Sequence, residues 1–503
     1  MSEVPSNLEA LGAQFARPAR EWRNRLHARR ASRGSTPVRA EKLPASVQIG
    51  DAQLGETLVG GEWQVLGHHI TLEGRTIWEA RLPEQRLEAE RQTFAWLDHL
   101  AALGNRSARE MAQAWTQEWI RRYGAGGGPG WSPEQAGLRA MRWTEHCAWL
   151  VDGAEPAMSE RFWRGLGAQQ SYLANCWGDA APGLARMRAL AGLVWSGVAL
   201  PHAGHRIAVT ELGLHCNEVI DPEGETPSRA PQALAEAMML LIWTARMLEN
   251  AGQFAAPAHL AAIVRAVPML RPLRLGDGTL ARFHGGGSGS PDRIDQALAE
   301  LRTGVHQKPA LSMGYARLSG GRIVVILDAA KPPGGVHAVR AHASTLAFEM
   351  SVGRQQVVVS AGPGAAFGAA SELISRQTSS HSALEVAGAS SAEFSSGDLA
   401  ARVFGPRLSA GPSLASVRQA QDATGQWLLA THDGYAASHG LLHERRVFVD
   451  ARGGELRGED ILTVPGAAAR ERFLNRAYDG TLSVIVRFHL HADVIAEIDP
   501  TGD

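Results

Sequence analysis

The sequence predicts an α+β protein in which a helical part comes first and an antiparallel β-sandwich follows. At 503 residues the chain is too long for one ordinary core, so two or three domains are expected. Of its 14 tryptophans, all but Trp427 lie before residue 250. The apolar residues of the first half recur about every 3.6 positions, and after about residue 275 the period becomes two.

These changes divide the chain into three parts. Residues 1–45 form a basic arm with seven arginines between positions 17 and 33. A flexible, solvated arm is the expected explanation, and a nucleic-acid-binding arm is the alternative. Residues 46–274 are the expected helical domain, and residues 275–503 the expected β-sandwich domain. The formal net charge of −1 gives no whole-chain field that would favour nucleic acid.

The helical domain opens with β-like stretches at 63–72 and 76–82, which could pair. From Glu88 onward the pattern is helical. Turn residues separate further helices expected at about 133–151, 157–177, 183–198, 204–219 and 231–252. Short loops between them are typical of antiparallel helix pairs.

The second half alternates apolar and polar residues, which is typical of strands. Strands are expected at 322–330, 344–352, 355–362, 382–388, 427–435 and 482–499, with a hairpin over 444–458 that turns near Gly453. Between the halves, GGGSG precedes a short helix that should begin at Pro291 with Ser290 as its cap. This glycine run does not follow a strand of a βαβ unit, so we interpret it as a linker or a flexible cleft edge.

Composition also limits compartment and cofactor. Three widely spaced cysteines without a C-x-x-C motif argue against a disulfide framework or a cysteine zinc site. The sequence has no run of about 18 apolar residues, so no membrane span is expected. Without a signal-type apolar stretch the expected location is the cytoplasm, with the periplasm as the alternative. The oligomeric state is left open.

Two groups of residues could carry chemistry. His342 precedes Leu346 and Phe348 on the apolar side of a predicted strand, where a hydrogen-bonded core histidine is the simplest explanation. Near Pro231, where a helix should begin, Ser228 is a plausible cap and Arg229 could join the helix N-terminus in an anion pocket. A capped helix with a solvent-exposed arginine is the alternative.

Several motifs, in order, resemble the heparinase II/III-like family of polysaccharide lyases over about residues 80–495. They are PSRAP, GDGTLARFHGGG, SMGYARL, AHASTLAFEMSVG, SRQTSSHSALEV, THDGY, HERRVFVDARGGELRGEDIL and VRFHLH. The resemblance implies an incomplete (α/α) toroid followed by an antiparallel β-sandwich. It also implies cleavage of a uronic-acid-containing glycan by β-elimination, in a cleft between the two parts.

Such chemistry needs a cation at the uronate carboxylate, a base for the C5 proton and an acid for the leaving oxygen. Carried over by motif, the resemblance implies His342, His381 and Tyr315 as catalytic residues. It implies a substrate-binding set of Ser228, Arg229, Gln170, Tyr172, His432 and Tyr435. No cofactor is required, and Zn²⁺ held by His342 and His381 is a further possibility because matching histidines lie at a zinc site in some members.

The sequence departs from the family pattern at three places. Arg340, His342 and Ser344 stand where such lyases often have H-x-H-x-D. Ser360 stands where a zinc-site carboxylate is expected, and the toroid asparagine and tyrosine have only loose matches in Gln170, Tyr172 and their neighbours. The expected partner is an acidic oligo- or polysaccharide. The first hypothesis is a lyase, and the second is a non-catalytic acidic-glycan-binding or envelope-associated protein on the same scaffold. A hydrolase using carboxylates near Asp221 is a weaker third.

Overall fold

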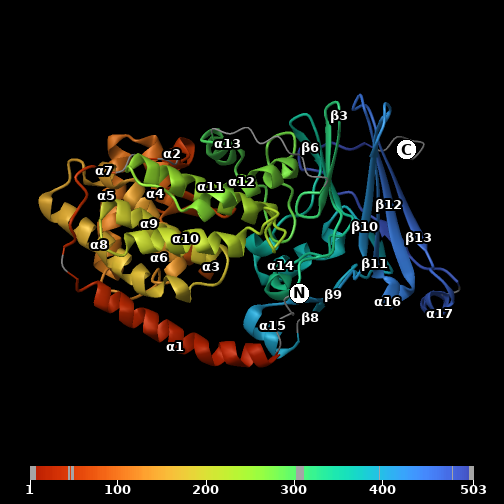
Figure 1. The fold of residues 1–503 in the computed structure, drawn as a ribbon, viewed down its shortest axis with the longest axis horizontal. Helices are drawn as coiled ribbons and strands as arrows, with labels where there is room; N and C mark the ends of the chain where they lie inside the picture. The colour runs from red at the N-terminus through yellow and green to blue at the C-terminus, as the bar shows by residue number, and fades with distance from the viewer. Residues whose placement is uncertain are drawn as a thin grey trace.

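The computed structural model describes residues 7–34, 36–43, 46, 50–301, 311–395, 397–477 and 480–497. Its first half is helical and its second half is built mainly of antiparallel sheets, as the change of period predicts (Figure 1). Within the described residues, none of the helices combines the length and apolar character needed to cross a bilayer.

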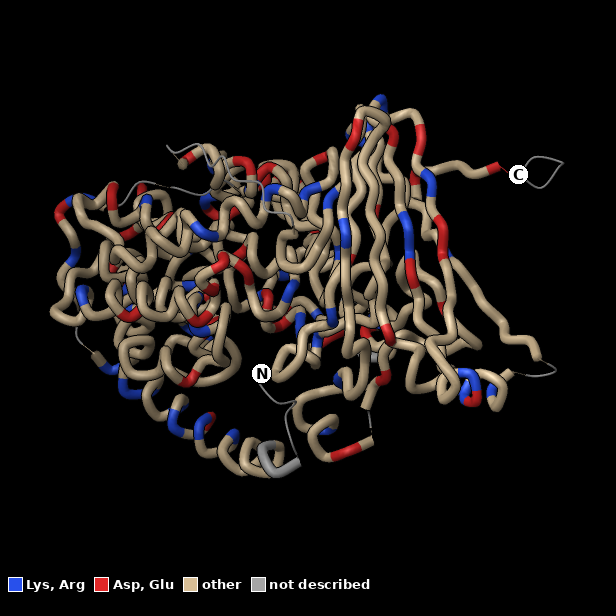
Figure 2. The backbone as a smooth tube through the Cα atoms, turned by 45° about the vertical axis from the view of Figure 1, so that its right-hand side comes forward, with Lys and Arg blue, Asp and Glu red and all other residues tan. Residues whose placement is uncertain are grey.

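The helical portion begins with the long helix α1, which starts beside α15 and runs away from it along the outer surface (Figure 1). Its helices are α1 (Asn7–Ala31), α2 (Ala52–Val59), α3 (Gln85–Thr93), α4 (Ala95–Leu103), α5 (Arg106–Tyr123), α6 (Pro133–Glu145), α7 (Cys147–Val151), α8 (Pro156–Cys176), α9 (Leu184–Ala199), α10 (His205–Val219), α11 (Pro231–Asn250) and α12 (Pro257–Leu270), with short 3₁₀ turns at Trp177–Asp179 and Arg271–Leu273. The predicted basic arm is therefore helical over most of its length, and its arginines stand out along α1 in Figure 2.

The predicted pair of strands at 63–72 and 76–82 is wrong. A single hairpin of β1 (Glu62–Val65) and β2 (His68–Thr71) covers the first stretch instead, and the second stretch forms no strand. Leu66 and Gly67 both have positive φ, which is the backbone that a tight two-residue hairpin turn requires. This turn brings Leu66 and Gly67 to the rim of a cleft described below.

Two four-stranded antiparallel sheets dominate the second half, with orders β3-β4-β5-β6 and β10-β11-β12-β13, and two-stranded sheets pair β14 with β7 and β8 with β9. The strands are β3 (Tyr315–Gly320), β4 (Ile323–Asp328), β5 (Phe348–Val352), β6 (Gln355–Val358), β7 (Leu384–Val386), β8 (Glu393–Ser395), β9 (Arg407–Ala410), β10 (Ala415–Gln421), β11 (Gly425–Tyr435), β12 (Leu441–Asp450), β13 (Leu456–Thr463) and β14 (Val484–Val486). The helices of this half are α13 (Pro291–Ala299), α14 (Ala369–Ser375), α15 (Leu399–Phe404), α16 (Ala436–His439) and α17 (Ala467–Arg476), and its 3₁₀ turns are Gly335–Val339, Gly364–Phe367 and Thr378–Ser380.

The β3–β6 sheet lies between the helices and the β10–β13 sheet. One face contributes Tyr315 and Ile326 to the large helical core. The other face contributes Leu318 and Val325 to a second core, which it shares with Leu428 and Val447 of the outer sheet. Alternating side chains therefore join three layers, so that residues at either end of the inner sheet face the helices.

Two local expectations differ from the structure. His342 does not lie on a strand: β5 begins only at Phe348, and Leu346 before it has a φ of 64°. The last expected strand, 482–499, is reduced to β14. The three cysteines are free and buried, as expected.

Candidate functional site

A cleft of about 860 Å³ opens in the helical portion where it meets the loops of the sheet portion. Its walls come from α3, α6, α9, α11 and α13, the β1–β2 turn, the loop Gly287–Ser290 and residues Pro363 and Ala365. Four arginines line it, against two carboxylates, and we call it the arginine cleft: Arg86, Arg142, Arg188 and Arg293 with Glu90 and Glu236. Its size falls within the ~300–1,000 Å³ typical of small-molecule sites.

Ion pairs hold several of these arginines in place. Arg142 donates from Nε to Asp98 (2.8 Å), which also contacts Nε2 of His146 (2.9 Å). Arg188 bridges Glu134 and Glu236 across two helices. The Arg293 guanidinium lies 4.9 Å from the ring centre of Trp243. The cleft therefore presents guanidinium groups, most of them ion-paired, on its helical walls, and apolar side chains such as Met141 and Met239 line it as well.

The glycine loop at 285–289 forms one edge of the cleft. Gly287 N–H donates to Oε1 of Gln232 on α11 (2.5 Å), and two residues earlier Gly285 N–H donates to Nε2 of His342 (2.8 Å). His284 and Gly285 both have positive φ, which turns the chain sharply at this point. The loop, predicted as a linker or a cleft edge, thus joins the arginine cleft to a buried polar cluster.

This cluster, which we call the histidine network, consists of Arg229, His284, Tyr315, Asp328, His342 and His381. The three imidazoles are 0–2% exposed. Because Nε2 of His342 accepts from Gly285, its proton belongs on Nδ1, which donates to Nε2 of His381 (3.1 Å). His381 then carries its proton on Nδ1, which is buried and has no partner among the described residues.

The second half of the network is ionic. Nδ1 of His284 accepts from the His342 backbone N–H (3.1 Å), so its Nε2–H faces Asp328 at 3.5 Å. The Arg229 guanidinium donates to Asp328 Oδ1 (2.5 Å) and to the Met313 carbonyl (2.9 Å). It also lies 4.9 Å from the centre of the Tyr315 ring.

Burial governs the protonation of the network. It lowers the pKa of His381 to about 3, that of His342 well below its ordinary value, and that of His284 in the same direction. Burial raises the pKa of Tyr315 well above its usual value. For Asp328, burial would raise the pKa, but the charge of Arg229 and the bond to His284 hold it below the usual range. At neutral pH the network therefore holds neutral imidazoles around one ion pair.

The other predicted site residues lie elsewhere. Gln170 and Tyr172 are in the helical core, where they donate to the carbonyls of Leu200 (2.8 Å) and Trp131 (2.5 Å). His432 is 1% exposed and donates towards Nδ1 of His443 (3.1 Å). Tyr435 is fully buried and donates to the Leu384 carbonyl (2.7 Å). The structure thus brings His342, His381, Tyr315 and Arg229 together in one network. Four other predicted residues are not part of it: Gln170, Tyr172, His432 and Tyr435.

The expected helix cap at Ser228 is wrong. Helix α11 begins at Pro231 as predicted, but Ala230 occupies the cap position, and no side chain caps the helix. Arg229 has a φ of 51°, and its guanidinium is turned to Asp328 on β4. Ser290 precedes α13 as predicted, but its side chain makes no capping bond.

The residues of the histidine network do not fit a tight zinc site. His342 and His381 bond to each other, and Ser360 occupies the position where a carboxylate was expected. In the part of the chain that the structure describes, no three His, Cys, Asp or Glu side chains are grouped to hold a metal ion.

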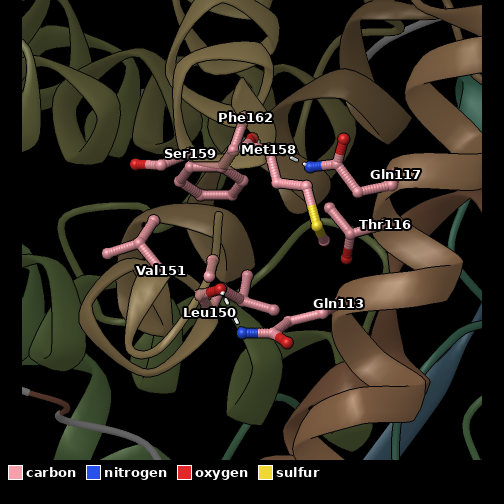
Figure 3. A pocket seen from close by; sticks show the side chains of 9 residues that line it. Gln113, Thr116, Gln117, Leu150, Val151, Met158, Ser159 and Phe162 are labelled. Atoms are coloured by element: carbon pink, nitrogen blue, oxygen red, sulfur yellow. Dashed lines mark hydrogen bonds between the residues drawn. The ribbon is translucent and has the colours of Figure 1, made fainter. Parts of the chain in front are cut away.

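A second crevice, between α5, α7 and α8, is too small for a ligand (Figure 3). Its volume of about 10 Å³ suits at most one water molecule. Gln113 and Gln117 span it by donating to the carbonyls of Leu150 and Met158, both at 3.0 Å.

Sequence reasoning missed Asp328, His284 and the four cleft arginines. Asp328 ends an apolar strand and His284 precedes a glycine run, which were usable signals. The arginines come from four separate helices, so only the tertiary fold brings them together.

Comparison with known proteins agrees with this architecture. Residues 302–502 match the family model described as "Heparinase II/III-like, C-terminal". The chain is 31% identical over 453 residues to FtsZ-localized protein C of Caulobacter vibrioides, which covers 87% of this chain and 77% of the relative.

Two heparinase III structures share the fold. One has a TM-score of 0.60 at 12% identity and covers 88% of this chain and 75% of its own. The other has a TM-score of 0.53 at 12% identity and covers 84% and 71%. With its order of motifs, its family-model match and its relative at 31% identity, this chain belongs to the heparinase II/III-like family.

Proposed function

We propose that this protein binds an acidic saccharide in the arginine cleft and does not cleave it. In this proposal the helical portion is an incomplete (α/α) toroid, the two four-stranded sheets are a β-sandwich, and the cleft at their junction takes a uronate-containing chain. The main observation behind this proposal is that the arginines line an open cleft, whereas the histidines are buried beside it and do not line it.

The charge of the cleft supports an acidic ligand. Guanidinium groups pair with carboxylate and sulfate oxygens through charge-assisted hydrogen bonds. Arg188 and Arg293 stand on neighbouring walls, and apolar side chains between them suit the faces of sugar rings. The fold that the chain shares with heparinase III is consistent with a saccharide ligand.

The state of the network supports binding without elimination. Among the described residues, those lining the cleft include no histidine or tyrosine. A general base works best when its pKa is near the working pH. His381, with a pKa of about 3, is a weak base at neutral pH, and Tyr315 donates to the Arg229 carbonyl at 2.7 Å.

The relative in Caulobacter supports a role outside free digestion of polysaccharide. Its name records localisation with FtsZ. We therefore place the saccharide binding of this chain in an envelope-associated role. A cytoplasmic location, with the periplasm as the alternative, is part of the same proposal.

The test is calorimetric titration with a uronate oligosaccharide and with a neutral oligosaccharide of equal length. The acidic ligand should bind, more weakly as salt rises, and Arg293→Gln should reduce its affinity about tenfold. Arg106→Gln is the matched control, because this side chain is 92% exposed and outside the cleft. Equal binding of the neutral ligand, or an unchanged Arg293→Gln protein, would refute the proposal.

β-Elimination is the second candidate, with His342, His381 and Tyr315 in proton transfer and Arg229 at the carboxylate. One observation favours it: the bond from Gly285 to His342 links the network to the cleft edge. For this, Arg229 would have to release the Asp328 carboxylate and bind the carboxylate of the substrate. An ultraviolet signal from unsaturated uronide that disappears in His342→Ala and Tyr315→Phe would establish elimination.

A further inference from the structure

A second groove, of about 260 Å³, lies at the free edge of β3, and Tyr315 of the histidine network is one of its lining residues. Pro272 from the end of the helical portion forms one wall, and the β10–β11 hairpin forms the other. We call it the glutamine groove, because its polar lining includes Gln419, Gln421 and Gln426, with Ser312 and Arg317. It is lined by no carboxylate within the described residues.

The strand register turns the three glutamines inward. Gln419 pairs with Leu428, which is buried in the core between the two large sheets, and Gln421 pairs with Gln426. Cross-strand partners share a face, and so do residues two apart on one strand. The amides therefore lie on the face that points towards β3, and Gln426 Oε1 accepts from the Ser319 N–H at 2.8 Å.

The donors of this groove are incompletely used. Among the described residues, the Gln426 NH₂ group makes only a long 3.5 Å approach to Oε1 of Gln421. Ser312 is 1% exposed, and its Oγ is buried without a hydrogen-bond partner in the described structure. A buried, unpaired hydroxyl is costly unless a ligand or water completes it.

Arg317 supplies the charge. Its Nη1 donates to the carbonyls of Pro272 (3.0 Å) and Arg274 (2.6 Å), which fixes the guanidinium at the wall of the groove. Burial lowers its pKa, and among the described residues no neighbouring carboxylate offsets that effect. A fixed, partly buried cation without an anion is a site that an oxyanion would complete.

We infer that the glutamine groove binds one acidic sugar unit, with Arg317 at its carboxylate or sulfate oxygens and the glutamine amides at its hydroxyls. The volume is just under the ~300 Å³ lower end for ligand sites, which suits a single ring and not a chain. This inference is independent of the arginine cleft, since the two sites share no lining residue.

The test is ligand-observed NMR titration of the Arg293→Gln protein, in which the cleft is weakened, with glucuronate, glucose and inorganic sulfate in parallel. Glucuronate should still bind saturably, and glucose about tenfold more weakly. Adding Arg317→Gln should reduce glucuronate affinity about tenfold. Gln419→Ala, at an exposed position, should reduce it severalfold and serves if the arginine variant does not fold.

Arg418→Gln is the matched control, because it lies on β10 with its side chain on the opposite face. The inference is overturned if Gln419→Ala and a folded Arg317→Gln both bind glucuronate as before. It is also overturned if inorganic sulfate binds as well as glucuronate, since the groove would then select an anion and not a sugar. Loss of cleft binding alone in Arg293→Gln leaves the groove prediction intact, so the two proposals fail separately.

Discussion

Asp328 is the residue on which the buried network depends. It is fully buried and accepts hydrogen bonds from Arg229 and from the Ser344 hydroxyl (2.8 Å). A charge in such a place is tolerated because its partner is buried with it. The ion pair also connects the loop just before α11 to the end of β4, so it joins the helical portion to the inner sheet.

Replacing Asp328 with asparagine should destabilise the protein by about 3–5 kcal/mol, because the Arg229 charge would remain buried without its partner. Urea unfolding at neutral pH measures this change. Glu110→Gln is the control: it breaks an exposed pair with Arg106 and should cost no more than about 0.5 kcal/mol. A loss below 1 kcal/mol in the asparagine variant would show that Arg229 finds other anions or water.

The buried histidines should make the protein less stable in mild acid. His381 has an ordinary unfolded pKa near 6.5 and a folded pKa of about 3, so between these values only the unfolded state takes up the proton. Stability should therefore fall as pH drops through that window, by about 2 kcal/mol for this residue between pH 7 and 5.

Urea unfolding at the two pH values, with wild type and His381→Gln, isolates the contribution of His381. On unfolding between these pH values, the variant should take up about one proton fewer than wild type, so its free energy of unfolding should fall less with pH, whatever its stability at pH 7. An identical pH dependence in the two proteins would mean that His381 titrates normally in the folded state.

Sequence reasoning located the histidines and Tyr315 because motifs mark them along the chain. It could not reveal that His342 and His381 bond to each other, since 39 residues separate them. It assigned Arg229 to a substrate because an arginine beside a helix N-terminus is a favourable place for an anion. Here the positive φ of Arg229 turns its side chain to Asp328, 99 residues away.

At the scale of elements, close glycine contacts decide how helices pack. Gly192 of α9 faces Gly137 of α6, and an added Cβ at Gly192 would lie 2.4 Å from the Gly137 Cα. Two helix backbones can approach this closely only where side chains are absent. The α6–α9 contact in turn places Arg142 and Arg188 on adjacent helices that line the arginine cleft.

Gly192→Ala should therefore destabilise the protein by about 1–3 kcal/mol through overpacking. Gly12→Ala is the matched control on helix α1, because an added Cβ there meets nothing within 4 Å. It should stabilise the protein by about 0.5–1 kcal/mol through helix propensity alone. Thermal unfolding compares the two, and equal effects of one sign would contradict this packing.

Element boundaries followed the sequence where local signals were strong. Proline marks the starts of α6, α8, α11 and α13, and the strand alternation of β11 and β12 was readable. The pattern around His342 misled because tertiary contacts bury Ser344 and Leu346 in an irregular segment, where alternation has no meaning.

At the scale of the molecule, the change from helical to strand period predicted the order of the two portions. It could not predict the layering, because the inner sheet is buried on both faces. Tyr315 and Ile326 on one face and Leu318 on the other are all apolar positions typical of a core. The arginine cleft arises at the junction of these layers, where helices, a hairpin turn and two loops meet. Its arginine lining and the burial of the histidines are together the basis for the proposal of binding without cleavage.

The most direct measurement is hydrogen exchange of the protein with and without a bound uronate oligosaccharide. The account predicts slower exchange at the glycine loop 285–289 and at the start of α11, whose backbone and side chains line the arginine cleft. It also predicts that the oligosaccharide is recovered at its original length. Protection confined to other surfaces, or recovery of shortened unsaturated products, would contradict it.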